Sequence, residues 1–362
     1  MTRGATIIGI AAAAFSLALP AAASADEGVP PDFFGVVPQE VLTLEDYARL
    51  ADGRVGTVRL PLNWAAHQQV KGKCQGEAQV GVCTWVYLDE IMARLAIAGV
   101  RAVPVLYGSP GFVSGKHTNK PPLGKGLDGW KAFVRAAAQR YGHGGFFWRG
   151  YSDAYGAKPQ PIDEWQVWNE QNAEQFWYPH PNARRYATLL KATAKALRQG
   201  DRSARVVLGG MFTDAKLSIG AFMRRLYKVK GIKRAFDELA VHPYARTIKE
   251  LEKQIHSARR AVRRGHDRDA GIRVTELGWS SKEGDHRLMV GREAQARLLE
   301  GAFRLVTDKR EAWNITGVNW FALRDTTNKF TCDFCLDSGL LEVGGEAKPA
   351  WGAFKKFSRP GG

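Results

Sequence analysis

The chain has 362 residues, of which 45% are hydrophobic and 24% charged, and its formal net charge is +16. This composition is that of a globular protein with ample length for a full core, which excludes a fibrous or intrinsically disordered chain. The length admits two domains, but one α/β barrel with insertions fits it equally well.

The first 25 residues have the form of a secretory signal peptide. Arg3 supplies a positive charge, residues 5–19 are apolar, and Ala23-Ser24-Ala25 is a small-residue cleavage site. The competing interpretation is an uncleaved membrane anchor, but the apolar stretch is short for a span. We expect a secreted chain that begins near Asp26 and has no membrane span once the signal is removed.

After the signal, short apolar segments alternate with helical ones. The predicted strands occupy residues 33–37, 56–64, 100–107, 162–168, 204–210, 238–244, 272–279 and 317–323, and the main predicted helices occupy residues 44–51, 87–98, 127–141, 182–199, 217–228, 248–264, 292–308 and 349–357. Such alternation implies a parallel sheet. Eight units favour a closed (β/α)₈ TIM barrel over an open doubly wound sheet, and no Gly-rich phosphate loop follows any strand. We therefore predict one domain over residues 26–362, and a monomer.

The four cysteines form two local pairs, Cys74 with Cys83 and Cys332 with Cys335. An exported chain favours local disulfides. A zinc site is the alternative, but one C-x-x-C and one C-x8-C without a neighbouring histidine pair have poor zinc spacing. A thioredoxin-like redox motif is a further alternative, and no redox fold surrounds it. We expect two disulfides and no metal or cofactor.

Much of the positive charge lies on predicted helices, as in residues 224–230 and 259–264. A solvated basic face is the simpler interpretation. The other is weak, salt-dependent attraction to anionic cell-wall material or acidic polysaccharide. Nucleic acid is not an expected partner, because the exported chain has no recognisable binding motif.

Two predicted strands end in a glutamate. The alternating run of residues 162–168 leads into Asn169 and Glu170, and the run that starts at Ile272 delivers Glu276. The carboxyl ends of parallel barrel strands meet at one rim, so both side chains are expected there. Two carboxyls at one rim are the minimum equipment for cleaving a glycosidic bond.

These strand ends resemble those of the retaining glycoside hydrolases of clan A, and within the clan the chain is most similar to family 39 and related family 5-like bacterial enzymes. The resemblance extends over essentially the whole mature chain. It is carried by Trp168-Asn169-Glu170, Thr275-Glu276-Leu277-Gly278-Trp279, Arg59, His242-Pro243-Tyr244, Trp320 and the closing Gly339-Leu340-Leu341 with Lys348-Pro349-Ala350. The chain departs from the pattern at Gln171, where many clan members have proline after the acid/base glutamate.

The resemblance implies that Glu170 is the general acid/base and Glu276 the nucleophile. A proton-holding carboxyl needs an apolar environment, which Trp168 and Trp177 could supply. An ionised nucleophile needs cationic or donor neighbours. The resemblance places Arg59 and Tyr244 in that role, and it assigns Asn169 a bond to the sugar 2-hydroxyl.

Two further residues keep more than one interpretation each. His242 either positions Tyr244 or lines the floor of the site, and the alternative is a histidine satisfied within the core. Trp320 is a candidate platform for a sugar face, although a buried tryptophan is usually core. Further subsite candidates are Trp64, Tyr107, Trp177, Tyr178 and Trp279.

The sequence thus predicts a secreted retaining glycoside hydrolase that cleaves a poly- or oligosaccharide by double displacement. One alternative is a non-catalytic glycan-binding barrel. Another is a cell-wall transglycosylase, which would use the same residues.

Overall fold

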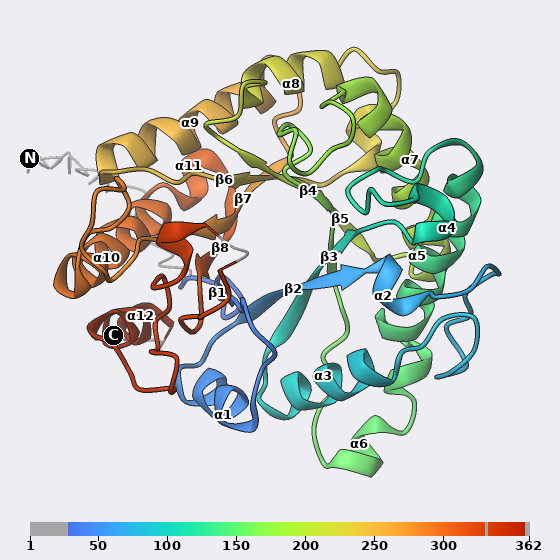
Figure 1. The fold of residues 1–362 in the computed structure, drawn as a ribbon, viewed down its shortest axis with the longest axis horizontal. Helices are drawn as coiled ribbons and strands as arrows, with labels where there is room; N and C mark the ends of the chain where they lie inside the picture. Colours follow the sequence, from blue (N-terminus) through green and yellow to red (C-terminus); the bar gives the residue numbers. More distant parts are fainter. Residues whose placement is uncertain (1–27, 330–331, 359–362) are drawn as a thin grey trace, which may run out of the picture.

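The structure is a computed structural model that describes residues 28–329 and 332–358, so the predicted signal peptide lies outside the described residues. The described chain forms a closed barrel in which eight strands follow one another in sequence order. Figure 1 shows this ring of strands surrounded by helices. Neighbouring strands are parallel, and β8 closes the barrel by pairing with β1. The predicted (β/α)₈ barrel is confirmed.

The eight predicted strands all occur, with shifts of a few residues at their ends. The strands are β1 (Phe34–Val37), β2 (Thr57–Asn63), β3 (Arg101–Tyr107), β4 (Glu164–Asn169), β5 (Arg205–Phe212), β6 (Glu238–His242), β7 (Gly271–Leu277) and β8 (Ile315–Phe321). The register shifts between β5 and β6 near Leu208 and Met211, and again between β7 and β8. The shift before Met211 and the one before Leu277 lie close to the strand ends that carry the site, where such features re-aim side chains.

The predicted helices surround the strands. They are α1 (Leu44–Asp52), α3 (Val86–Ile97), α5 (Leu127–Tyr141), α7 (Ala183–Gly200), α8 (Ile219–Leu226), α9 (Ile248–Arg264), α10 (Arg292–Asp308) and α12 (Pro349–Ser358). Shorter segments are α2 (Trp64–His67), α4 (Gly111–Ser114), α6 (Tyr151–Tyr155), α11 (Arg310–Trp313), η1 (Gly124–Gly126), η2 (Phe146–Trp148), η3 (Ile232–Ala235) and η4 (Asp333–Cys335). Side-chain caps start several of these helices. Thr43 and Asp46 form a capping box on α1, and Asn182 accepts from two backbone amides of α7.

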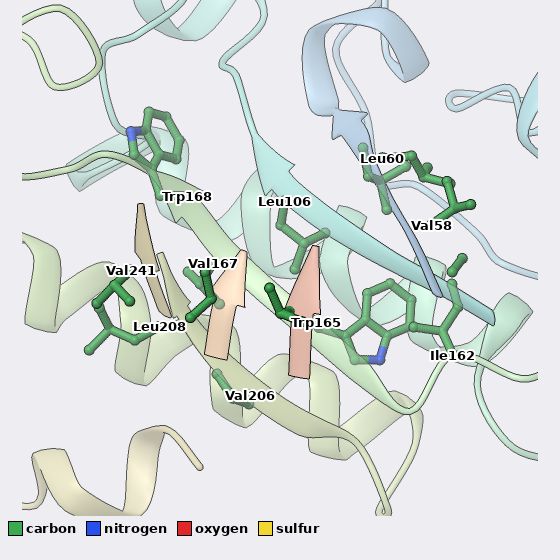
Figure 2. Packing of buried hydrophobic residues seen from close by; sticks show 14 of the residues in the cluster. Val58, Leu60, Leu106, Ile162, Trp165, Val167, Trp168, Val206, Leu208 and Val241 are labelled. Carbon is green, nitrogen blue, oxygen red and sulfur yellow. The ribbon is translucent and has the colours of Figure 1, made fainter. Parts of the chain in front are cut away.

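The main apolar core lies between the strands and the surrounding helices. Figure 2 shows this packing around β4 and β5. Trp165 and Val167 of β4 and Val206 and Leu208 of β5 are completely buried. Full burial of one such aliphatic side chain contributes roughly 1.5–3 kcal/mol. Packing against the surrounding helices therefore stabilises the strands that carry the site.

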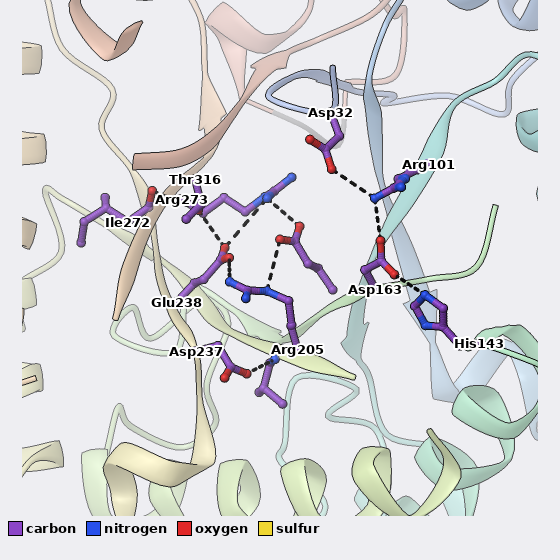
Figure 3. Close-up of polar contacts among 12 residues, drawn as sticks. Asp32, Arg101, His143, Asp163, Arg205, Asp237, Glu238, Ile272, Arg273 and Thr316 are labelled. Atoms are coloured by element: carbon purple, nitrogen blue, oxygen red, sulfur yellow. Dashed lines mark hydrogen bonds and ion pairs between the residues drawn. The ribbon is translucent and has the colours of Figure 1, made fainter. Parts of the chain in front are cut away.

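Charged side chains converge at the starts of the strands (Figure 3). Glu170 and Glu276 lie at the opposite ends of β4 and β7. Arg273 Nη1 lies 2.6 Å from Glu164 Oε2, and Arg205 Nη2 lies 2.7 Å from Glu238 Oε1. The Thr316 hydroxyl donates to Glu238 over 2.9 Å. Buried charges are tolerated only when they are paired in this way. Burial, partly offset by attraction to Arg273 but reinforced by repulsion from Glu238, raises the pKa of Glu164 to about 7.

Both predicted disulfides are present. Cys74–Cys83 closes a loop between α2 and α3, and Cys332–Cys335 closes a shorter loop after β8. Within the described residues, none of the helices combines the length and apolar character that crossing a bilayer requires.

Candidate active site

Glu170 and Glu276 lie at the same rim of the barrel. Glu170 directly follows β4, and Glu276 is the second-last residue of β7. Three atoms lie within 4.8 Å of one another: one carboxylate oxygen of Glu170, one carboxylate oxygen of Glu276 and a ring nitrogen of His242. The expectation that both carboxyls emerge at one rim therefore agrees with the structure.

The end of β4 has an unusual backbone. Trp168 and Glu170 have φ values of +71° and +42°, in a region that residues with side chains seldom adopt. Each such residue costs on the order of 1–3 kcal/mol and persists only where its surroundings impose it. Here the Glu170 amide donates to the Gly210 carbonyl over 2.8 Å. The strained turn is thus anchored to β5 and fixes the direction of Glu170.

Gln171, where the chain departs from the family pattern, contributes to the same anchor. Its side chain is completely buried, and its Nε2 donates to the Gly209 carbonyl over 3.0 Å. A Cβ atom at Gly209 would lie 2.1 Å from Gln171 Oε1, so only glycine leaves room for this amide. The departure therefore affects the support of Glu170 rather than the lining of the site.

Glu276 has a donor on each of its oxygens. Arg59 Nη1 donates to Oε1 over 2.7 Å, and the Tyr244 hydroxyl donates to Oε2 over 2.8 Å. The same guanidinium donates through Nη2 to Asn169 Oδ1 over 2.7 Å and through Nε to Gln166 Oε1 over 2.8 Å. Arg59 and Tyr244 flank Glu276 as predicted.

These neighbours decide the charge state of Glu276. Burial acts to raise the pKa of this carboxyl, but attraction to His242 and Arg59 and the bonds from Tyr244 and Arg59 outweigh burial and lower it. Burial raises the pKa of Tyr244 well above its usual value, and the charge on Glu276 raises it further. The tyrosine therefore keeps its proton as a donor, and the glutamate is ionised near neutral pH.

His242 lies between the two carboxyls. It is completely buried, its Nδ1 is 2.7 Å from Glu170 Oε1 and 3.5 Å from Glu276 Oε2, and its Nε2 is 3.0 Å from the Thr275 hydroxyl. Its nitrogens thus contact the carboxyls and Thr275 rather than Tyr244. Of the three interpretations of His242, these contacts agree with a place at the floor of the site, and not with a role in positioning Tyr244 or with a histidine satisfied within the core away from the site. Glycine at position 210 makes this possible, since a Cβ there would lie 2.0 Å from His242 Nε2.

The rim carries a large cavity of about 1260 Å³, and both glutamates line it. Two groups of side chains form its walls. The first group comes from the loops after β4 and β5 and from α8, and it includes Asn172, Phe176, Lys216, Leu217 and Arg225. The second group comes from β8 and from the loops after β6, β7 and β8, and it includes Tyr244, His286, Arg287, Phe321 and Phe334. Loops at this face of a barrel are where such enzymes build their sites.

The structure contradicts the expectation that Trp320 is an open sugar platform. Trp320 is completely buried, its Nε1 donates to the Ser338 carbonyl, and its ring lies 5.9 Å from that of Trp279. The next residue, Phe321, lines the cavity instead. Successive strand side chains point to opposite faces, so only one residue of this aromatic pair can face the site.

The other aromatic subsite candidates also divide into residues that line the cavity and residues that are buried. Tyr107 lines the cavity, whereas Trp64, Trp177 and Trp279 are completely buried. Tyr178 stacks on His117 at 3.9 Å. The ring of Trp168 contacts those of Trp130 in α5 and Trp177, so these tryptophans belong to the core beside the helices.

Several contributors escaped the sequence interpretation. Gln166 lies two residues before the end of its predicted strand, and Thr275 directly precedes Glu276, so their positions were an available signal. His286 and Arg287 come from a loop with no recognisable motif, and Phe334 lies within the C-x-x-C segment, which indicated a disulfide but no place in the site. Only the folded chain brings these three residues to the cavity.

Glu170, His242 and Glu276 are also close enough together to hold a metal ion. Every one of these side chains is already engaged, and the positive guanidinium of Arg59 lies 2.7 Å from Glu276. A cation would have to compete with that charge at short range. The donor set therefore favours acid–base chemistry of the two carboxyls over metal binding.

The fold has been seen before in carbohydrate-active enzymes. A family 39 glycoside hydrolase from Bacteroides cellulosilyticus WH2 superposes with a TM-score of 0.64 at 17% identity, covering 91% of this chain and 64% of that one. A glucosidase from Croceicoccus marinus gives 0.67 at 12% identity over 90% and 67% of the chains. A monomeric beta-xylosidase from Caulobacter crescentus CB15 gives 0.62 at 16% identity over 91% and 68%. This chain has the fold of these glycoside hydrolases.

These similarities concern the fold, because the identities are low, and the chain spans about two thirds of the length of the three structures. No protein-family model matches the sequence, and no curated protein matches it. The presence of a family 39 enzyme among the structural neighbours agrees with the clan resemblance of the strand ends.

Proposed function

We propose that the chain is a retaining glycoside hydrolase that cleaves an O-glycosidic bond in a poly- or oligosaccharide. The observation that carries this proposal is the approach of the Glu170 and Glu276 oxygens to within 4.8 Å. Retaining enzymes hold their carboxyl groups about 5–5.5 Å apart, whereas inverting enzymes leave roughly 6.5–9.5 Å for a water molecule. The short separation favours direct attack by one carboxylate.

The two steps follow from the roles that the clan resemblance assigns to the carboxyls, and the lowered pKa of Glu276 agrees with its role as nucleophile. Ionised Glu276 attacks the anomeric carbon while Glu170 gives its proton to the leaving oxygen, so the glycosidic bond breaks and a glycosyl ester forms. In the second step Glu170 takes a proton from water, whose oxygen attacks the same carbon and releases Glu276. Two displacements at one carbon restore its configuration.

The surrounding residues support these roles. Arg59 and Tyr244 stabilise the charge that Glu276 needs before attack. A guanidinium has only donors, so Asn169 must present its oxygen to Arg59. This leaves the Asn169 amide nitrogen, which has no partner among the described residues, free to donate to the sugar 2-hydroxyl.

His242 is the third supporting residue. Its Nδ1 contacts Glu170, and its Nε2 is held by Thr275, so the buried ring cannot rotate without losing both contacts. We propose that it orients Glu170 towards the leaving oxygen.

One experiment tests the assignment of roles. Glu276→Gln should abolish turnover of a panel of glycans and aryl glycosides. Glu170→Ala should lose most activity on poor leaving groups, and azide should restore it with a β-configured glycosyl azide, because azide needs no base. Inverted product in an NMR time course would contradict the roles.

The same panel separates the alternatives. Binding of glycans without any turnover would favour a non-catalytic glycan-binding barrel. Transfer products in place of hydrolysis products would favour a transglycosylase.

We also propose that the mature chain is a secreted monomer whose single domain spans residues 26–362. The disulfides agree with export, because they form in oxidising compartments. N-terminal sequencing of the exported protein and its mass in solution would test these points.

A further inference from the structure

The loop after β8 reaches into the wall of the cavity. Its short helix η4 spans Asp333–Cys335, and Cys332, Phe334 and Cys335 all line the cavity. The Cys332–Cys335 disulfide therefore forms part of the candidate active site. The Cys74–Cys83 disulfide, by contrast, contributes nothing to this lining.

Phe334 sits within a group of rings beside the nucleophile. Its ring lies 5.3 Å from Tyr244 at an interplanar angle of 67°, and 5.1 Å from His286 at 6°. Phe321 meets Tyr244 from another direction at 6.3 Å and 90°. Tyr244 is the residue that donates to Glu276, so this aromatic wall lies next to the carboxylate that attacks the sugar.

Several bonds hold the loop that presents Phe334. The Cys335 amide donates to the Cys332 carbonyl over 2.9 Å, and the Ser338 hydroxyl donates to the Phe334 carbonyl over 2.6 Å. Gln39 Nε2 donates to the Cys335 carbonyl over 2.9 Å. The disulfide further restricts the conformations open to this four-residue turn.

We infer that Phe334 forms a wall of the subsite for the sugar that Glu276 attacks, and that the Cys332–Cys335 disulfide holds it in place. This inference rests on the proposed function, which places the glycone at Glu276 and the leaving group at Glu170. An aromatic wall stacks on the C–H face of a pyranose whose substituents are mostly equatorial. The site therefore favours glycones of the gluco or xylo type over those with an axial hydroxyl on that face.

The first test varies the sugar and keeps the leaving group constant. The 4-nitrophenyl β-glycosides of glucose, xylose, galactose and mannose are hydrolysed by the wild type, Phe334→Ala and Phe334→Tyr. Phe334→Ala should lower kcat/KM about tenfold on the preferred glycone, mainly through KM, and reduce discrimination among the four. Phe334→Tyr keeps the ring and should restore both.

The second test addresses the disulfide and has a matched control. Cys332→Ser with Cys335→Ser should reproduce the loss seen with Phe334→Ala. Cys74→Ser with Cys83→Ser should leave kcat/KM unchanged, because that disulfide lies outside the cavity. Thermal denaturation of each variant establishes that it is folded before its kinetics are compared.

Calorimetric binding of glucose, xylose and mannose to Glu276→Gln, with and without Phe334→Ala, gives a readout that does not need turnover. If the wild type hydrolyses none of the four glycosides, binding that weakens with Phe334→Ala would support the wall and refute the proposed activity. If the wild type is active and Phe334→Ala changes neither kcat/KM nor the glycone preference, the inference is overturned. Equal kinetics of the two disulfide variants would overturn the role of Cys332–Cys335.

Discussion

Arg59 connects the residues that the proposed reaction needs. From β2 its guanidinium reaches Glu276 on β7, Asn169 at the end of β4, and Gln166 deeper in the same strand. A planar group with fixed donors holds these partners at set angles, which a lysine could not reproduce. One side chain therefore both stabilises the nucleophile and orients the amide proposed to meet the 2-hydroxyl.

The hydroxyl of Tyr244 gives a prediction at this scale. It stabilises the ionised form of Glu276, so Tyr244→Phe should raise the pKa of Glu276 and move the acidic limb of the kcat/KM profile to higher pH. Loss of a bond to a charged group should also lower kcat/KM about 10- to 100-fold at the optimum. Tyr107→Phe is the matched control, since Tyr107 lines the cavity and does not bond Glu276. An unmoved acidic limb in Tyr244→Phe would show that the hydroxyl does not set this pKa.

The strands that deliver the site also carry a charge cluster at their other ends. β4 begins with Glu164 and leads to Glu170, and β6 begins with Glu238 and ends with His242. Arg273 enters the cluster from β7, three residues before Glu276. Figure 3 shows Glu238 and Arg273 converging with Arg205 at the starts of the strands. A buried pair of this kind contributes little net stability but is sensitive to the loss of one partner.

Glu164 makes the stability of the barrel depend on pH. Its pKa in the fold is about 7 against 4.5 in the unfolded chain, so its contribution is complete below about 4.5 and is lost as pH rises towards 7. Glu164→Gln should remove this dependence, which amounts to on the order of 1–3 kcal/mol in the free energy of unfolding. Urea denaturation at pH values about one unit apart (4.5, 5.5, 6.5 and 7.5), which span both pKa values, measures this pH dependence.

The exposed Glu311 provides the control for these urea denaturations. Glu311→Gln should keep the wild-type dependence of the free energy of unfolding on pH. If the free energy of unfolding changed with pH by the same slope in wild type and Glu164→Gln, the pKa of Glu164 in the fold would be its ordinary value.

At the scale of the whole molecule, the net charge of +16 acts on partners rather than on the fold. We predict weak retention on isolated cell walls that falls as salt is raised from 50 to 500 mM, which shortens the Debye length roughly threefold. Helix α9 presents Arg260 and Arg264 to solvent, so Arg260→Gln with Arg264→Gln should reduce retention, and Glu252→Gln should not. Retention that does not respond to ionic strength would exclude an electrostatic origin.

The sequence alone determined the order of eight strand and helix units and the rim on which Glu170 and Glu276 emerge. Both follow from local periodicity, because a parallel barrel brings the carboxyl ends of all its strands to one face. The flanking of Glu276 by Arg59 and Tyr244 followed from family resemblance at strand ends.

Tertiary structure decided what local pattern leaves open. Whether Trp320 or Phe321 faces the cavity depends on the register of β8 against its neighbours, because the two side chains point to opposite faces. The place of His242 between the carboxyls depends on the space that Gly210 leaves on β5. Phe334 reaches Tyr244 only through the path of a disulfide-closed loop, and loop paths depend on contacts with residues far away in sequence.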